Sequence, residues 1–396
     1  MVFLESYAKC TGLTSKLKKI PIWAIIFFMS ALILVFTRPE LSKTLDSTYF
    51  MFKDKDFLEL LINIFLIFSF GSLIKKSGHL KRLGEKLVLV FPDRIAITVL
   101  PMIMGFFPMP GGALFTVDFV KQVGEGKKIS PNILAFANYW FRHVWEFIYP
   151  LYPGFILYYT LLKISPFEIF KRQAILSFIM ILLGYIVIFY NSPKKEFCLK
   201  KAIMNIFSLF YDLWFIGIIF FFIFMRLPVY IALFICCIIV CIIHRIKFKE
   251  IVYSVFKSIN IEVVFTIYFI FFFQKVLEIS QLSHKIQIFV NNYSDSSLLI
   301  CIIFPFLTGY LTGITTSFVG ICFPVLLPMF EGNIWLAVIS YTSGFAGVLL
   351  TPVHLCLSLT VSSFKADFKK VYFYIIPISF ILILSSLGLY FLCLKC

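Results

Sequence analysis

The stretch Pro108-Met-Pro-Gly-Gly-Ala-Leu-Phe115 interrupts a part of the chain that is otherwise mostly apolar, with apolar flanks at 103–107 and 113–119. Its prolines and glycines cannot continue an α-helix, because proline lacks a backbone N–H and glycine loses more backbone entropy than any other residue when it becomes helical. Irregular backbone is tolerated at membrane depth only where protein buries it or where it lines water. We therefore predict a re-entrant hairpin here, with a plain extramembrane turn as the alternative.

The rest of the sequence indicates a membrane protein. Of its 396 residues, 61% are hydrophobic and 14% are charged, whereas a soluble domain is about half apolar and a quarter charged. The apolar residues form blocks long enough to cross a hydrocarbon core of roughly 30 Å as helices. We predict an all-α polytopic membrane protein with about ten to eleven transmembrane helices, counting 93–107, 203–224 and 297–311 among them. The first apolar block, 20–36, is expected to be a retained span because no cleavage site follows it.

The charge distribution points to the cell membrane. The net charge is +16, from 36 Lys and Arg against 20 Asp and Glu. The basic residues lie between the apolar blocks, as Lys75 and Lys76 do, which is typical of cytoplasmic loops. We predict a multi-pass protein of the cytoplasmic membrane, with the lipid bilayer as its partner, no nucleic acid, and a possible homodimer.

Enzyme signatures are missing from the sequence. It has no GxSxG, HExxH, Walker A or GxGxxG motif. The pair Cys393-Leu-Lys-Cys396 has no second pair for zinc and no following helix for redox chemistry. We therefore predict no catalytic residue, no resident metal and no cofactor, with Na⁺ or H⁺ only as a coupling ion.

The sequence also contains a weak internal repeat with an offset of 202 residues. The shift superposes like residues, namely Tyr139 on Tyr341, Pro150 on Pro352 and Gly111 on Gly313. We predict one membrane domain over 1–396, with repeat one at about 20–190, a linking helix at about 203–224 and repeat two at about 228–394. With five spans in each half, a crossing linker would make the repeats parallel, so either 203–224 does not cross or another predicted span does not.

The second-half counterpart of the first hairpin is Thr312-Gly-Ile-Thr-Thr-Ser-Phe-Val-Gly320. Its hydroxyl groups suit a cation or a carboxylate, and close helix packing on small residues is the alternative. Each hairpin precedes a long apolar span that a proline interrupts, 131–162 in the first half and 335–363 in the second. Paired broken segments at matching positions indicate a transporter binding site.

The first interrupted span carries Asn138, Arg142, His143 and Glu146. Ionisable residues inside a span are costly and usually face a cavity or a partner. Because Arg142 and Glu146 are four residues apart, they are expected to share a helix face and could neutralise each other. In the functional interpretation Arg142 binds a substrate anion, and Glu146 or His143 carries a proton. The alternative is a structural ion pair near a membrane interface.

In the second interrupted span, Gly344 and Pro352 would allow the helix to unwind, and Ser343 and Thr351 would then face one cavity. His354 lies just past the break and is explained at least as well as a core histidine. The predicted proton-coupling residues are His143 and Glu146. The predicted substrate-binding residues are Pro110, Gly111, Gly112, Asn138, Arg142, Thr312, Gly313, Thr315, Thr316, Ser317, Ser343, Gly344 and Thr351.

At these segments the chain resembles the integral-membrane family called domain of unknown function 401. The residues that carry the likeness are Pro108–Leu114, Arg142-His-Val-Trp-Glu146 with Pro150–Pro153, Thr312–Ser317 with Gly320, and Gly344–Gly347 with Thr351–His354. The resemblance implies membership of the ion transporter superfamily, alongside gluconate, citrate and dicarboxylate carriers. It also implies two inverted repeats, each with a re-entrant hairpin and a broken helix that bind cation and anion. The Ser-Asn-Thr motifs of dicarboxylate carriers are replaced here by Pro-Gly-Gly and Thr-Gly-Ile-Thr-Thr.

Together these features predict a secondary active transporter of a small anionic, carboxylate-type metabolite, coupled to H⁺ or Na⁺. Two other classes remain open on the residues alone. A membrane-embedded lipid-modifying enzyme would use His143 and Glu146 and would not need the second hairpin. A passive channel would need no ion coupling.

Overall fold

The structure, a computed structural model, describes residues 21–39, 53–78, 93–107, 112–125, 129–191, 213–258, 261–282, 285, 288, 296–330 and 333–393. All regular secondary structure within these ranges is helical. The predicted site residues Pro110 and Gly111 lie outside the described residues, as do Cys396 and the first part of the predicted linking helix.

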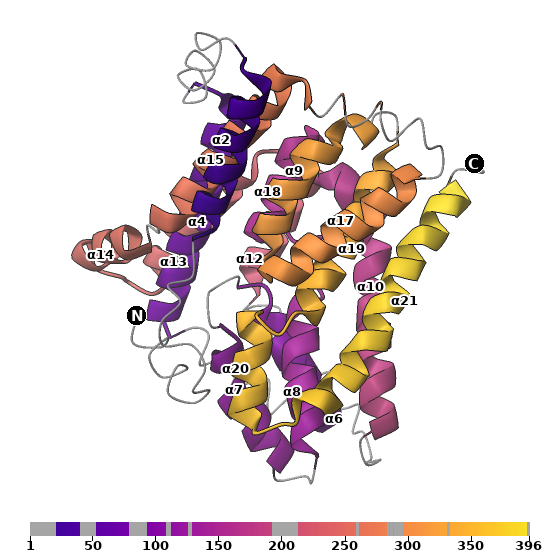
Figure 1. Ribbon diagram of the computed structural model, residues 1–396. Helices are drawn as coiled ribbons and strands as arrows, with labels where there is room; N and C mark the ends of the chain where they lie inside the picture. Colours follow the sequence, from indigo (N-terminus) through magenta and orange to yellow (C-terminus); the bar gives the residue numbers. More distant parts are fainter. Residues whose placement is uncertain are drawn as a thin grey trace, which may run out of the picture.

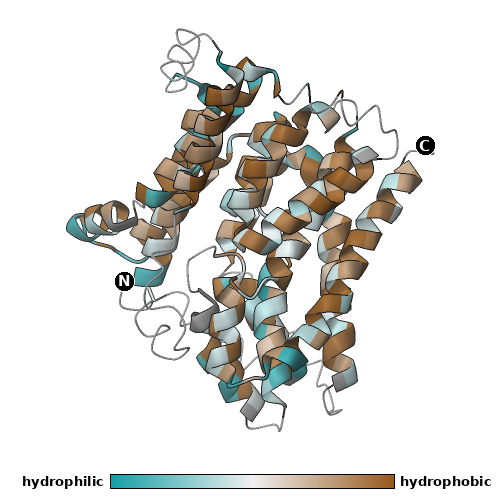
Figure 2. Ribbon diagram, viewed as in Figure 1, coloured by the Kyte–Doolittle hydropathy of each residue, from teal (hydrophilic) through white to brown (hydrophobic). Residues whose placement is uncertain are grey.

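Five helical stretches are long and apolar enough to cross a membrane. They are α4 (Lys55–Lys76), α10 (Pro166–Asn191), α15 (Ile261–Ser280), α21 (Phe368–Cys393), and residues 334–364, which contain α19 (Ile334–Leu350) and α20 (Leu355–Phe364). Shorter apolar helices, among them α2 (Ile22–Thr37) and α13 (Val229–Ile243), pack beside them. Hydrophobic residues dominate the long helices (Figure 2), and large apolar side chains such as Phe178 and Leu384 are exposed on them. The prediction of an all-α polytopic membrane protein is confirmed.

Two helical hairpins enter the bundle from opposite ends. Hairpin 1 consists of α6 (Asp93–Met104) and α7 (Gly112–Glu125), at the lower end in Figure 1. Hairpin 2 consists of α17 (Ser296–Thr312) and α18 (Thr315–Leu326), at the upper end, followed by the short helix η2 (Leu327–Phe330). The 12 residues of α6 extend only roughly 18 Å, too short for a 30 Å hydrocarbon core. α17 is longer but turns back at Gly313 to pack against α18. The segments 93–107 and 297–311, predicted as spans, are therefore arms of hairpins that return to the end they came from.

Two helices are broken near the middle of the bundle. In the first half, α8 (Pro131–Trp140) is followed by the 3₁₀ turn η1 (Phe141–His143) and irregular turns before α9 (Pro153–Leu162). We call 141–152 the first break. In the second half, residues 351–354, the second break, separate α19 from α20. Figure 1 shows α8 and α20 in the lower part of the bundle and α9 in the upper part, so the breaks meet between them.

The two halves are inverted relative to each other. α10 follows α9 and runs downward in Figure 1, whereas α21 follows α20 and runs upward to the C-terminus. These two helices pack side by side in opposite directions. The first helix of each half packs on a helix of the other half: α2 contacts α15, and α13 contacts α4.

The inversion resolves the difficulty with the linking helix. When the hairpin arms are not counted as spans, each repeat crosses the membrane an even number of times. If a loop joined two such repeats, the second would have the same orientation as the first. One further crossing between them inverts the second half, and α12 (Trp214–Phe224) is an apolar helix in that position. The exact domain boundaries remain a prediction.

Matching glycines show that the repeat extends to the packing. A Cβ atom on Gly105 of hairpin 1 would collide with the backbone oxygen of Arg142, and one on Gly309 of hairpin 2 with that of Gly344. Residues 142 and 344 are themselves 202 apart. Each hairpin therefore presses a glycine against the same position of the broken helix in its own half.

Candidate functional site

The first break follows from the prolines that flank it. Pro150 has no N–H to donate to the backbone oxygen of Glu146, four residues earlier, so a continuous helix cannot form there. Pro153 then begins α9 at a position where a missing N–H costs nothing. The oxygen that Pro150 leaves free accepts a hydrogen bond of 2.9 Å from the Tyr341 hydroxyl of α19.

A repeat-related tyrosine does the same for the second break. The Tyr139 hydroxyl of α8 donates to the backbone oxygen of Leu349, near the end of α19, at 3.0 Å. Tyr139 and Tyr341 are the pair that the offset of 202 superposes, and both are fully buried. Each half thus supplies a donor to a backbone acceptor at or next to the break of the other half, and a buried acceptor is costly when it is left unpaired.

Side chains of the first break hold the end of α6. Arg142 donates to the backbone oxygens of Met104 and Phe107, both at 3.3 Å. Trp145 donates to Met102 at 2.7 Å. Tyr152 donates to Gly105 at 2.6 Å and to Arg142 at 3.2 Å. The cation of Arg142 therefore lies at the negative, C-terminal end of a helix, where it is favoured electrostatically.

This arrangement corrects the predicted pairing of Arg142 with Glu146. The spacing of four brings side chains together only on a continuous α-helix, and α8 ends at Trp140. Within the described part of the chain, no ion pair joins the two residues, although both are buried, at 5% exposure each.

Glu146 instead faces the other half of the molecule. One carboxylate oxygen accepts a hydrogen bond of 2.9 Å from Thr315, at the start of α18. The other lies 4.0 Å from Nε2 of His143. The buried carboxylate of the first break thus meets the tip of hairpin 2. The predicted residues His143, Glu146, Gly313 and Thr315 are brought together here.

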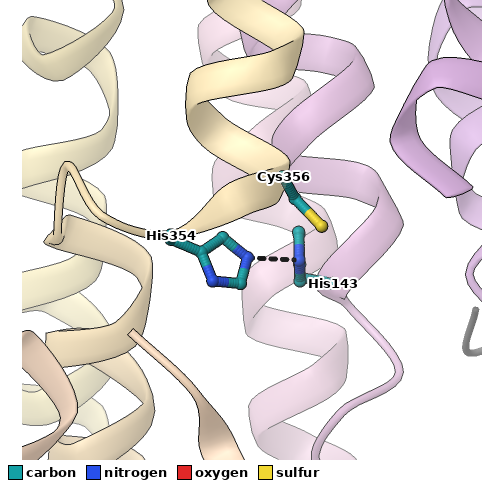
Figure 3. Close-up of side chains that lie close together, drawn as sticks. All are labelled: His143, His354 and Cys356. Atoms are coloured by element: carbon teal, nitrogen blue, oxygen red, sulfur yellow. Dashed lines mark hydrogen bonds between the residues drawn. The ribbon is translucent and has the colours of Figure 1, made fainter. Parts of the chain in front are cut away.

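A second histidine completes this centre. Nε2 of His354, in the second break, lies 3.2 Å from Nε2 of His143, and the two rings are tilted by 63°. Nδ1 of His354 lies 2.8 Å from the backbone oxygen of Gly313. Figure 3 shows the sulfur of Cys356, at the start of α20, pointing toward the same two rings. Neither His354 nor Cys356 was among the predicted site residues.

The tip of hairpin 2 requires its glycine. Gly313 joins α17 to α18 with a φ of +67°, a backbone conformation that other residues adopt only at a cost. A Cβ atom there would lie 3.1 Å from Thr351 and 3.3 Å from the backbone nitrogen of His354. The tip therefore packs directly on the second break.

Several predicted residues make structural contacts away from this centre. Asn138 accepts a hydrogen bond from Thr116 of α7 and donates to Thr360 of α20 at 3.2 Å. Ser343 donates to the backbone oxygen of Ile302 at 2.6 Å. Thr312 donates to the backbone of its own helix at 2.8 Å.

The remaining predicted residues fall into three groups. Ser317 is buried in α18, and among the described residues its hydroxyl has no hydrogen-bond partner. Thr316 is the second residue of α18, Gly112 is the first residue of α7, and Thr351 directly follows the last residue of α19. Gly344 lies inside the continuous helix α19, beside Phe318, so the helix unwinds after it and not at it.

The fold and the centre define an all-α polytopic membrane protein with two inverted repeats, whose hairpins and broken helices meet inside the bundle. A sequence model of the family described as "Protein of unknown function (DUF401)" matches residues 10–392. The chain belongs to this family. No curated protein matches the chain.

Proposed function

We propose that the protein is a secondary active transporter of a small, carboxylate-type anion, coupled to H⁺ or Na⁺. The observation that carries the proposal is the meeting of the two breaks with the tip of hairpin 2, where Glu146 of the first half contacts Thr315 of the second. A contact of this kind between inverted repeats must change when one half moves against the other. That movement is the basis of alternating access.

The architecture supports this reading beyond the single contact. Inverted repeats with paired discontinuous helices are characteristic of secondary transporters, whose sites lie at the repeat interface near mid-membrane. The resemblance to the ion transporter superfamily implies the same layout, and placement in that superfamily is part of our proposal.

The anion is proposed from charge. Arg142 is a buried cation of the first break, and guanidinium has five N–H donors in a fork that suits a carboxylate. The N-terminus of α18, beginning at Thr315, adds the partial positive charge of a helix end. Because Arg142 also holds α6, its removal would affect folding as well as binding.

A cavity at the upper end of the bundle provides a starting point for access. Its volume is about 960 Å³, and its lining includes Lys163, Arg172, Gln274, Pro324 and Asn333. Among the described residues that line it, none is a predicted site residue. From Pro324, α18 extends nine residues back to Thr315, or roughly 13 Å. Cargo entering here would reach the centre only if hairpin 2 moves.

The proposal is tested by uptake into proteoliposomes. Radiolabelled mono-, di- and tricarboxylates are offered with an imposed pH or Na⁺ gradient. We expect one class to accumulate above its external concentration only while a gradient is present. Uptake that merely equilibrates would indicate a channel, and no uptake of any carboxylate under either gradient would overturn the anion assignment.

A glycine pair separates the carrier from a membrane enzyme. Gly313→Ala strains the tip of hairpin 2 and should abolish uptake, because the tip must fit the second break. Gly388→Ala in α21, where a Cβ atom meets nothing within 4 Å, is the control and should transport normally. Unchanged uptake by Gly313→Ala would contradict a role for this hairpin.

A further inference from the structure

His143, His354 and Cys356 gather where the two breaks meet, and the predicted anion site uses neither His354 nor Cys356. The two imidazoles come from different breaks and face each other through Nε2 at 3.2 Å. Their ligand atoms and the sulfur of Cys356 all lie within 4.8 Å of one another (Figure 3). His143 is almost fully buried, whereas the other two are half-buried.

The hydrogen bonds made by Nδ1 of each imidazole determine which ring nitrogen carries the hydrogen. Nδ1 of His143 lies 2.7 Å from the backbone oxygen of Tyr139, and Nδ1 of His354 lies 2.8 Å from that of Gly313. A carbonyl oxygen only accepts, so each Nδ1 carries the hydrogen. In the neutral rings both Nε2 atoms then present lone pairs to each other, which is repulsive unless a proton or a metal cation lies between them.

We propose that this cluster binds a divalent transition-metal cation of the zinc class. His143 and His354 would coordinate through Nε2, Cys356 through its thiolate, and Glu146 through the carboxylate oxygen that lies 4.0 Å from His143 Nε2. The site links the two halves, because two ligands belong to the first break and the other two to the second break and α20. It does not depend on the proposed transport.

The geometry fits such an ion. In a tetrahedral zinc site, with metal–nitrogen distances of about 2.0–2.1 Å, two nitrogen ligands are about 3.3 Å apart, close to the 3.2 Å between the Nε2 atoms. Metal-bound histidines usually donate their other N–H to a carbonyl or carboxylate, as both do here. The sulfur lies within 4.8 Å of a ring nitrogen of each histidine, and the Glu146 oxygen lies 4.0 Å from Nε2 of His143, so both ligands move closer when the ion binds.

The charges also balance. A divalent cation with one thiolate, one carboxylate and two neutral imidazoles is neutral overall, which suits a buried site. On binding, the thiol of Cys356 transfers its proton to solvent, and the sulfur gains the metal bond. A shared proton would relieve only the two nitrogens, whereas a metal ion would use the nitrogens, the sulfur and the carboxylate together.

The test uses Co²⁺ as a spectroscopic probe. The protein is purified in detergent through a tag without histidine, stripped with a chelator and titrated with Co²⁺, then with Zn²⁺. We expect about one Co²⁺ per chain, with the intense visible bands of a tetrahedral ion and a thiolate charge-transfer band, both lost when Zn²⁺ displaces it. Stripped wild-type protein that takes up no Co²⁺, or shows a weak octahedral spectrum without sulfur, would overturn the site.

Variants assign the ligands. Cys356→His should keep Co²⁺ binding but lose the charge-transfer band, and His354→Gln should weaken binding by more than about tenfold. Cys241→Ser, a half-buried cysteine of α13 outside the cluster, is the matched control and should bind as wild type. Each variant is checked by size-exclusion elution. If a variant fails to fold, the Co²⁺ spectrum of the wild-type protein decides whether the site exists. A charge-transfer band that persists in Cys356→His would exclude Cys356 and overturn the proposed ligand set.

Discussion

The two breaks share a fold but not a chemistry. The first is long and carries Arg142, Trp145 and Tyr152, which together donate to four backbone oxygens near the end of α6. The second is four residues long and contacts hairpin 2 through His354. The repeat preserves packing, as Gly105 and Gly309 show, whereas the position of Arg142 is a glycine in the second half.

This difference assigns unequal roles to the halves. The first break supplies charge and anchors its hairpin with long side chains. The second half supplies a tip of small residues, Gly313 and Thr315, that lies against the charged groups. The tip of hairpin 2 is therefore the more suitable element to move, because its two side-chain hydrogen bonds to the breaks are fewer than those on α6.

The largest expected effect is that of Arg142→Ala on stability. It removes two hydrogen bonds from a charged donor to buried carbonyl oxygens, each worth about 1.5–3 kcal/mol, so we expect a loss of about 4 kcal/mol. The measurement is thermal unfolding in detergent. Arg226→Ala is the control, because its side chain is 65% exposed and its ion pair with Glu168 spans 3.7 Å, which is worth about 0–1 kcal/mol. Equal unfolding midpoints for the two variants would contradict the claim that Arg142 stabilises the fold by holding the end of α6.

A smaller effect is expected from the paired glycines. Gly105→Ala and Gly309→Ala both force a Cβ atom against backbone, and we expect each to cost about 1–3 kcal/mol. Gly217→Ala in α12 meets nothing within 4 Å and should be neutral or slightly stabilising. Unfolding midpoints measure all three. If only one of the paired variants is destabilised, the packing equivalence of the hairpins fails.

The smallest effect concerns the two exchanged tyrosines. Tyr139→Phe and Tyr341→Phe each remove one hydrogen bond to the break of the other half, with an expected loss of about 1 kcal/mol apiece. Tyr149→Phe is the control, because among the described residues the buried Tyr149 hydroxyl has no partner. A Tyr149 variant that loses as much as the other two would show that the hydroxyl contacts are not the cause.

Much of the fold could be predicted from the sequence, because its cues are local or periodic. Proline and glycine marked the second hairpin tip and both breaks, and the offset of 202 paired Tyr139 with Tyr341. The hairpin arms were mistaken for spans because apolar composition does not tell an arm that returns from a helix that crosses. That error, and not the linking helix, made the orientation of the halves unclear.

The centre was harder to predict because its contacts are distant in sequence. His143 and His354 are separated by 211 residues, and no spacing rule connects them. The predicted Arg142–Glu146 pair failed because the helix ends two residues before Arg142. The signal that could have indicated His354 and Cys356 is their place at the second break, opposite the ionisable residues of the first.

The central claim, that the tip of hairpin 2 gates a shared site, is tested most directly by a single cysteine. Thr315→Cys is introduced with the other cysteines replaced, and a membrane-impermeant maleimide is applied from each side of proteoliposomes. We predict labelling from one side at a time, with the reactive side changing or labelling falling when cargo and gradient are supplied. Labelling from both sides at once, or no labelling under any condition, would contradict the account.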